Sequence, residues 1–133
     1  MTTKTPMTCA LLVLASAAVA QEAQVKPAVP VMITANEDYD ACGTMGVAHG
    51  LDPRGDGFLA VKAGPGLRYR RIDRLYNGDQ VYICATSGPW FAIVYTRTEV
   101  DCNVSTPWPR SMAYTGPCHS GWAHKRWIKP TAG

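Results

Sequence analysis

Short apolar segments separated by turn sequences are the main feature of the chain after residue 57. Within them apolar side chains recur at every second position, the period of a β-strand, and no run of about ten residues has helical spacing. The pattern predicts strands at residues 58–62, 80–85 and 90–96. Turns rich in Gly, Pro or Asn separate these strands, at residues 63–66, 77–78 and 86–89. The arginine-rich segment 68–75 is predicted to be a loop.

The segment 90–96 differs from the other two because both of its faces are apolar. One face carries Phe91, Ile93 and Tyr95, and the other carries Trp90, Ala92 and Val94. A strand with two apolar faces is covered on both sides, so we expect it at the centre of a sheet. The 12 Gly and 10 Pro among 133 residues also favour turns over long helices. We therefore predict an all-β chain that forms a small barrel or sandwich.

Residues 1–20 have the pattern of a secretory signal peptide. Lys4 gives a positive start, residues 9–17 are apolar, and Ala18-Val19-Ala20 provides small residues for cleavage. The apolar stretch is about half of the roughly 20 residues that cross a bilayer, and a retained anchor is the alternative. We expect cleavage after Ala20 and a periplasmic or secreted mature chain without a membrane span.

Residues 21–40 read as an extended linker, because Pro27 and Pro30 interrupt them and no apolar period is present. The folded domain is expected over residues 41–130. Within it we expect an extra N-terminal strand and a long insertion at about residues 97–120, rich in Pro, Ser and Thr.

Four cysteines remain in the mature chain, and in an exported protein an even number indicates disulfides. Four cysteines allow more than one connectivity. We favour Cys102 with Cys118, which would close the insertion, and consequently Cys42 with Cys84. A zinc site or a catalytic cysteine is the alternative, but neither CxxC nor HxxxH spacing is present.

The net charge of +3 is too small for the dense basic surface that nucleic acid binding requires. The histidines, at positions 49, 119 and 124, are not spaced like those of a metal or nucleophile motif. We therefore expect no metal, no cofactor and no enzymatic activity, and a monomer that does not bind nucleic acid. A small hydrolase is the less favoured alternative.

Four blocks of sequence resemble the bacterial SH3 (SH3b) family. They are LAVKAGPG at residues 59–66, L-x-NGDQV at 75–81, GPWFAIV at 88–94 and GWA at 121–123. The resemblance covers about residues 58–95 and 118–129 and implies a small SH3-like β-barrel of about five strands. It also implies a noncatalytic module that binds a cell-wall peptide or an envelope protein segment.

Aromatic rings and arginines are the candidate ligand-binding residues, because rings offer rigid contact area and guanidinium groups bind carboxylates. The candidates are Arg68, Tyr69, Arg71, Trp90 and Trp108. Arg71 could equally belong to a solvated edge, and Trp90 could be core. The basic loop predicts an acidic ligand, such as a peptidoglycan stem peptide or an envelope protein. The other functional class is an inhibitor or accessory subunit of a periplasmic enzyme, docked through the insertion.

Overall fold

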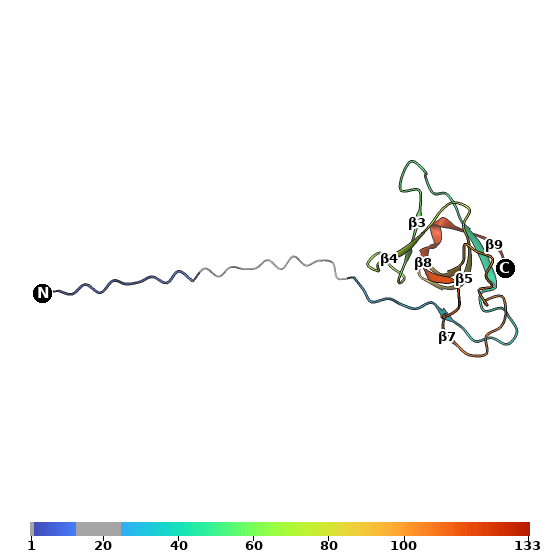
Figure 1. Cartoon of the computed structure of the whole chain (residues 1–133), viewed down its shortest axis with the longest axis horizontal. Coiled ribbons are helices and arrows are strands. Elements are labelled where there is room, and N and C mark those ends of the chain that lie inside the picture. Colours follow the sequence, from blue (N-terminus) through green and yellow to red (C-terminus); the bar gives the residue numbers. More distant parts are fainter. Residues whose placement is uncertain (1, 13–24) are drawn as a thin grey trace.

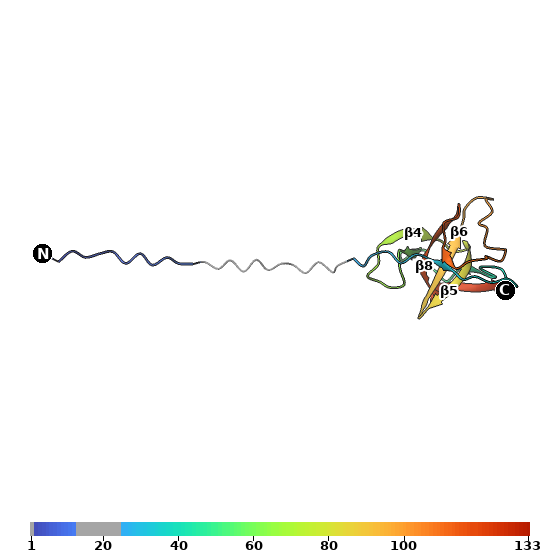
Figure 2. The same ribbon diagram turned by 90° about the horizontal axis from the view of Figure 1, so that it is seen from below.

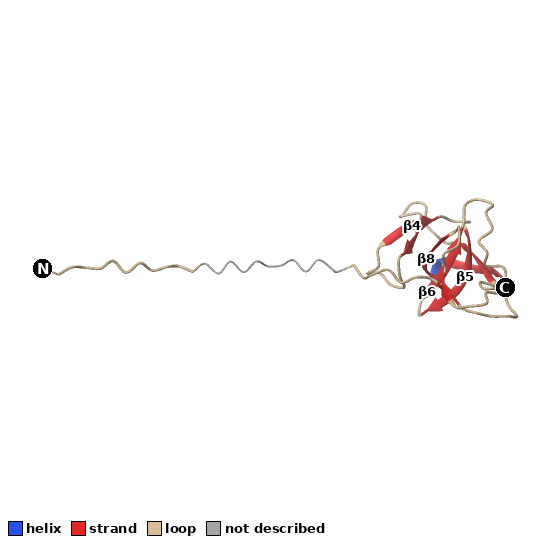
Figure 3. Ribbon diagram, turned by 60° about the horizontal axis from the view of Figure 1, so that its bottom comes forward, coloured by secondary structure: helices blue, strands red, loops and turns tan. Residues whose placement is uncertain are grey.

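The computed structural model describes residues 2–12 and 25–133, and its folded part is built from β-strands. The strands are β1 (Met32–Ile33), β2 (Thr44–Ala48), β3 (Leu59–Lys62), β4 (Arg71–Leu75), β5 (Gln80–Ser87), β6 (Trp90–Tyr95), β7 (Met112–Ala113), β8 (His119–His124) and β9 (Ile128–Ala132). A single turn of 3-10 helix, η1 (Lys125–Trp127), precedes β9. Loops make up much of the remainder (Figure 3). The all-β prediction is confirmed.

Seven strands form one antiparallel sheet in the order β4-β3-β8-β6-β5-β2-β9. β6 lies between β5 and β8 in this order, so the prediction of a central strand is confirmed. Figure 2 shows the three strands in the folded part of the chain. The β6–β8 ladder runs from Trp90 opposite His124 to Tyr95 opposite His119. β2 occupies the extra N-terminal segment, and β1 pairs with β7 outside the large sheet. These pairings place β6 between two layers of side chains.

The sheet has more strands than the five expected, and one lies where a loop was predicted. β4 pairs with β3 from Leu59 opposite Leu75 to Lys62 opposite Arg71. The loop prediction is wrong for Arg71–Leu75. Leu75 is the only buried residue of this strand, because β4 is an edge of the sheet and most of its side chains face solvent. Such a strand lacks the apolar alternation by which strands are found in a sequence.

One face of the sheet encloses an inner cluster of buried side chains contributed mainly by the strands. Ile93 and Tyr95 of β6 belong to it and are 0% and 2% exposed. The other members are Ala48, Leu51, Leu59, Val61, Leu75, Val81, Ala123 and Ile128. Apart from Tyr95 all are aliphatic.

The other face of β6 contributes to an outer cluster, which is covered by irregular chain segments. Trp90, Ala92 and Val94 come from β6. The other members are Val31, Ile33, Cys42, Cys102, Val104, Trp108, Tyr114 and Trp122. Each apolar face of β6 thus packs into a different cluster, in agreement with the prediction that both faces are covered.

The N-terminal segment contributes to this outer cluster, and the extended-linker prediction is wrong for its second half. Val31 and Ile33 are 3% and 0% exposed. The Val29 carbonyl accepts a hydrogen bond from Trp122 Nε1 at 2.9 Å, and the Val31 carbonyl accepts one from the Tyr114 N–H at 2.8 Å. In Figure 1 the segment runs beside β7. Two apolar residues with one residue between them were too short a signal to predict a strand.

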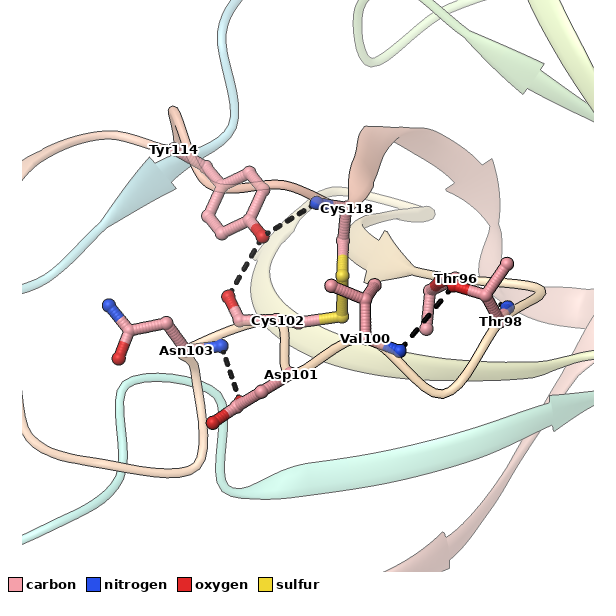
Figure 4. Close-up of a disulfide and its surroundings, with 8 residues drawn as sticks. All are labelled: Thr96, Thr98, Val100, Asp101, Cys102, Asn103, Tyr114 and Cys118. Atoms are coloured by element: carbon pink, nitrogen blue, oxygen red, sulfur yellow. Dashed lines mark hydrogen bonds between the residues drawn. A yellow bond between two sulfur atoms is a disulfide. The ribbon is translucent and has the colours of Figure 1, made fainter.

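Both preferred disulfides are confirmed, Cys42 with Cys84 and Cys102 with Cys118. The second closes the insertion, and there the Tyr114 hydroxyl donates to the Cys102 carbonyl at 2.8 Å (Figure 4). The same hydroxyl accepts from the Cys118 N–H at 3.2 Å. Two disulfides indicate an oxidising compartment outside the cytoplasm.

The predicted cleavage after Ala20 and the start of the predicted linker, residues 21–24, lie outside the described residues. Cys9 is within them, exposed and without a disulfide partner. No helix in the described ranges has the length and apolar character needed to cross a membrane.

Candidate functional site

A groove of about 360 Å³ lies beside β3. The pairing between β3 and β8 consists of Lys62 opposite Trp122, so the two strands do not continue as a ladder towards Ala60 and His124. The groove lies at this interruption. It is lined by Leu51, Asp52, Asp56, Gly57, Phe58, Leu59, Ala60, Lys62, Leu67, Trp90, His124 and Trp127.

The apolar lining of the groove comes from both clusters. Leu51 and Leu59 belong to the inner cluster, and Trp90 belongs to the outer one. Leu67 is 82% exposed although it also lines the groove. Leu67 therefore adds exposed apolar area to a mostly apolar groove, and ligand sites are concave surfaces of this kind.

Trp90 and His124 form an aromatic wall, with ring centroids 5.4 Å apart in an edge-to-face arrangement. The Arg126 N–H donates to His124 Nδ1 at 3.1 Å. An accepting Nδ1 places the proton of the neutral ring on Nε2, which is therefore a hydrogen-bond donor. The wall thus combines apolar area with a polar donor.

Charged side chains of both signs also line the groove. Asp52 and Asp56 come from the turn before β3, and Lys62 is the last residue of that strand. The Asp52 Oδ1 atom accepts the Arg54 N–H at 2.8 Å, which orients this carboxylate within the turn. Across the described ranges the one ion pair joins Arg97 to Asp73, so the groove charges are not neutralised by such contacts.

Phe58 connects the groove to the arginines of β4. The guanidinium carbons of Arg71 and Arg74 lie 5.3 Å and 4.4 Å from the centroid of the Phe58 ring. Arg71, a predicted ligand-binding residue, therefore lies behind the groove wall rather than in its lining. Guanidinium groups over an aromatic face hold it by electrostatic attraction and leave their outward N–H groups free.

Tyr69 and Arg68 lie beside the groove residue Leu67, but not in the groove. The Tyr69 ring packs closely over Gly64, where a side chain would collide with it. Lys26 Nζ lies 5.4 Å from the centroid of this ring, and the Lys26 N–H donates to the Arg68 carbonyl at 3.2 Å. Tyr69 thus packs against its own loop at Gly64 and contacts the N-terminal segment at Lys26.

Trp108 is 8% exposed and lies in the outer cluster, away from the groove. Its Nε1 donates to the Asn103 carbonyl at 2.7 Å, and its ring stacks on Tyr114 with centroids 6.2 Å apart. The structure therefore brings one predicted residue, Trp90, into the groove and places Arg71 behind it. Arg68, Tyr69 and Trp108 lie elsewhere.

Sequence reasoning missed most of the lining, including Phe58, Lys62 and His124. The turn at residues 52–57 and Trp127 were not among the predicted site residues. Alternation of Phe58, Ala60 and Lys62 along one strand was the available signal, but it does not reveal which strand lies opposite.

Asp73, in the middle of β4, forms a separate polar network. It accepts hydrogen bonds from the Tyr95 hydroxyl at 2.6 Å and from Arg97 at 2.9 Å. Burial alone would raise the pKa of the Asp73 carboxyl, but these hydrogen bonds outweigh it and lower the pKa to about 2. Burial and the bond to Asp73 together raise the pKa of Tyr95. This network joins β4 to β6 and to the start of the insertion.

No group of three or more His, Cys, Asp or Glu side chains in the described part of the chain is arranged to hold a metal ion. Comparisons with known proteins found no matching family model, no matching curated protein and no matching solved structure. The groove itself is therefore the basis for the functional argument.

Proposed function

We propose that this chain is an exported, noncatalytic binding module of the bacterial SH3 type, which binds a short peptide of the cell wall in the β3 groove. The observation that carries the proposal is the groove itself, in which Trp90 and His124 form a wall beside the exposed side chain of Leu67. Grooves of this kind, apolar with a few polar groups, bind ligands by burying apolar area and orienting them with hydrogen bonds.

The SH3 assignment is supported by the segments that resemble the family, which form β3, β5, β6 and β8 of one antiparallel sheet. The tight turn that the NGDQV block requires is also present, with Gly78 at a φ of 92°. Export to the periplasm is supported by the signal-like sequence of residues 1–20 together with the two disulfides.

A noncatalytic role is supported by the chemistry of the groove. His124 Nδ1 accepts a backbone N–H instead of being oriented by a carboxylate, as a general base usually is.

Sedimentation with purified peptidoglycan tests this function. Leu67→Ala should reduce retention on the wall, because a ligand in the groove covers this exposed side chain and the loss is worth about 1 kcal/mol or more. Met112→Ala is the matched control, since Met112 is 47% exposed and does not line the groove. Both replaced side chains are exposed, so both variants should melt like the original chain.

Three other results would each reject the proposal. Equal retention of both variants would remove the groove from the site. Capture of one stoichiometric envelope protein, without retention on peptidoglycan, would favour an inhibitor or accessory subunit. Release of soluble wall fragments by the purified chain would show that it is an enzyme.

A further inference from the structure

The charges of the groove are separated along β3. Asp52 and Asp56 belong to the turn that leads into this strand, and Lys62 ends it. From Phe58 to Lys62 an extended chain advances about 13 Å, which is the length of about four residues. The groove therefore has carboxylates near one end and an ammonium group near the other.

The cationic end is supplied by Lys62, which lines the groove. Arg71 is the partner of Lys62 in the β3–β4 ladder, but its guanidinium carbon lies 5.3 Å from the centroid of the Phe58 ring, so its charge is not counted at this end. Lys62 is half-buried, which makes its charge more sensitive to a neighbour than that of a fully solvated lysine.

The anionic end is held in place before any ligand binds. The Asp52 Oδ1 atom accepts the Arg54 N–H, and the Asp52 carbonyl accepts the Gly55 N–H at 3.0 Å. Gly57, the last residue of the turn, has a φ of 68°, a conformation that glycine adopts easily. The carboxylate at the turn is thus oriented by the backbone and does not need to be ordered by the ligand.

Much of the remaining lining is apolar and includes Ala60, Leu67 and Trp90. Apolar walls reduce the screening of charges near them, so a ligand that matches both ends gains more than it would on an open surface. A ligand of a single charge would place that charge near one favourable end and lose the other.

We propose that the groove selects dipolar peptides, with an amine placed at Asp52 and Asp56 and a carboxylate placed at Lys62, about four extended residues apart. This inference rests on the proposed function and specifies its ligand. It differs from the simple preference for acidic ligands that the basic loop predicted, because it requires a positive group on the ligand as well as a negative one.

The test uses four versions of one probe, the tetrapeptide alanine-leucine-alanine-alanine. It is titrated with free termini, with an acetylated amine, with an amidated carboxylate, and with both caps, while backbone amide shifts of the labelled full chain are followed by NMR. Each cap should weaken binding by roughly threefold, the scale of an exposed ion pair, and both caps by roughly tenfold. In about 0.5 M NaCl the four affinities should converge, because the charges are then screened.

Variants assign each charge to its end. Lys62→Gln should remove the difference in affinity between the peptide with a free carboxylate and the amidated peptide. It should keep the difference in affinity between the peptide with a free amine and the acetylated peptide. Asp52→Asn with Asp56→Asn should do the reverse, and the Asn side-chain oxygen can still accept the Arg54 N–H. Lys129→Gln is the matched control, because Lys129 is exposed on β9 and does not line the groove.

The possible failures are distinct. Equal binding of all four peptides, or a preference for the carboxylate alone, overturns the dipolar inference and leaves wall binding intact. The same conclusion follows if peptidoglycan retention depends on Leu67 but no tetrapeptide binds. Absence of both peptide binding and peptidoglycan retention overturns the proposed function itself.

Discussion

The inner and outer clusters share strand β6 but are built from different kinds of chain. The inner cluster is almost entirely aliphatic and is supplied mainly by strands, whose backbone groups are hydrogen-bonded within the sheet. The outer cluster contains three tryptophans and Tyr114, and irregular segments cover it. Buried backbone in a loop has no ladder to satisfy it, so other donors and acceptors are needed.

The aromatic side chains of the outer cluster meet this need. The indole N–H of Trp108 and that of Trp122 each donate to a loop carbonyl, at 2.7 Å and 2.9 Å. The Tyr114 hydroxyl donates to one backbone group and accepts from another. An aromatic residue with a polar atom can fill volume and satisfy loop backbone at once, which an aliphatic residue cannot. Disulfides then limit the freedom that irregular chain would regain on unfolding.

Removal of the N-terminal segment should have the largest effect on this outer layer. A chain that begins at Asp40 lacks Val31 and Ile33, and part of the outer face of β6 is then uncovered. We expect its free energy of unfolding to be lower by about 5 kcal/mol. Urea unfolding monitored by tryptophan fluorescence measures this free energy. A midpoint close to that of the longer chain would show that the segment covers the outer cluster without stabilising it.

The two disulfides should differ in their contribution because they close loops of different length. Cys42 and Cys84 are 42 residues apart, and Cys102 and Cys118 are 16 apart. The chain-entropy model gives about 4 kcal/mol for the longer loop and about 3 kcal/mol for the shorter. Paired Cys→Ser variants, Cys42 with Cys84 and Cys102 with Cys118, measured by denaturant unfolding, test the order. The reverse order would mean that the insertion depends on its bridge more than loop length implies.

A matched pair of isoleucines compares the two clusters directly. Ile33 in the outer cluster and Ile93 in the inner one are both 0% exposed. Substitution by Ala should lower the free energy of unfolding by about 3 kcal/mol at Ile93 and by about 2 kcal/mol at Ile33. The loss is smaller at Ile33 because the two-residue strand β1 can move to fill part of the cavity, whereas the central strand β6 cannot. Equal losses in thermal or urea unfolding would show that both layers are equally rigid.

The smallest expected effect concerns pH and the link between β4 and the insertion. The pKa of Asp73 is lowered from 3.8 to about 2 in the folded chain, so its stabilisation is present above pH 3.8 and lost as pH falls towards 2. The side chain is 30% exposed, so solvent screening keeps the contribution below about 1 kcal/mol. Asp73→Asn should flatten the decline in stability between these pH values, and an unchanged acid profile of the variant would contradict this role.

Much of the inner region could be predicted from local sequence. Alternating apolar residues marked β3, β5 and β6, and the two apolar faces of 90–96 marked the central strand. The Asn77-Gly78 turn was also predicted from residue type. The cysteine pairs, which lie at the outer cluster, were preferred over the other possible connectivities because of the composition of the loop that one of them closes. These features depend on side-chain period, turn geometry and loop composition, which are properties of neighbouring residues.

The outer layer and the groove were decided by tertiary structure. Val31 and Ile33 are buried because β7 and Tyr114, about 80 residues later, lie beside them, and no local pattern records that contact. The groove exists because the β3–β8 ladder is a single pair long, so a turn, a strand end and a histidine from separate parts of the chain line one space. Long-range pairing brings these charges and rings together, whereas sequence period reports only on residues within one element.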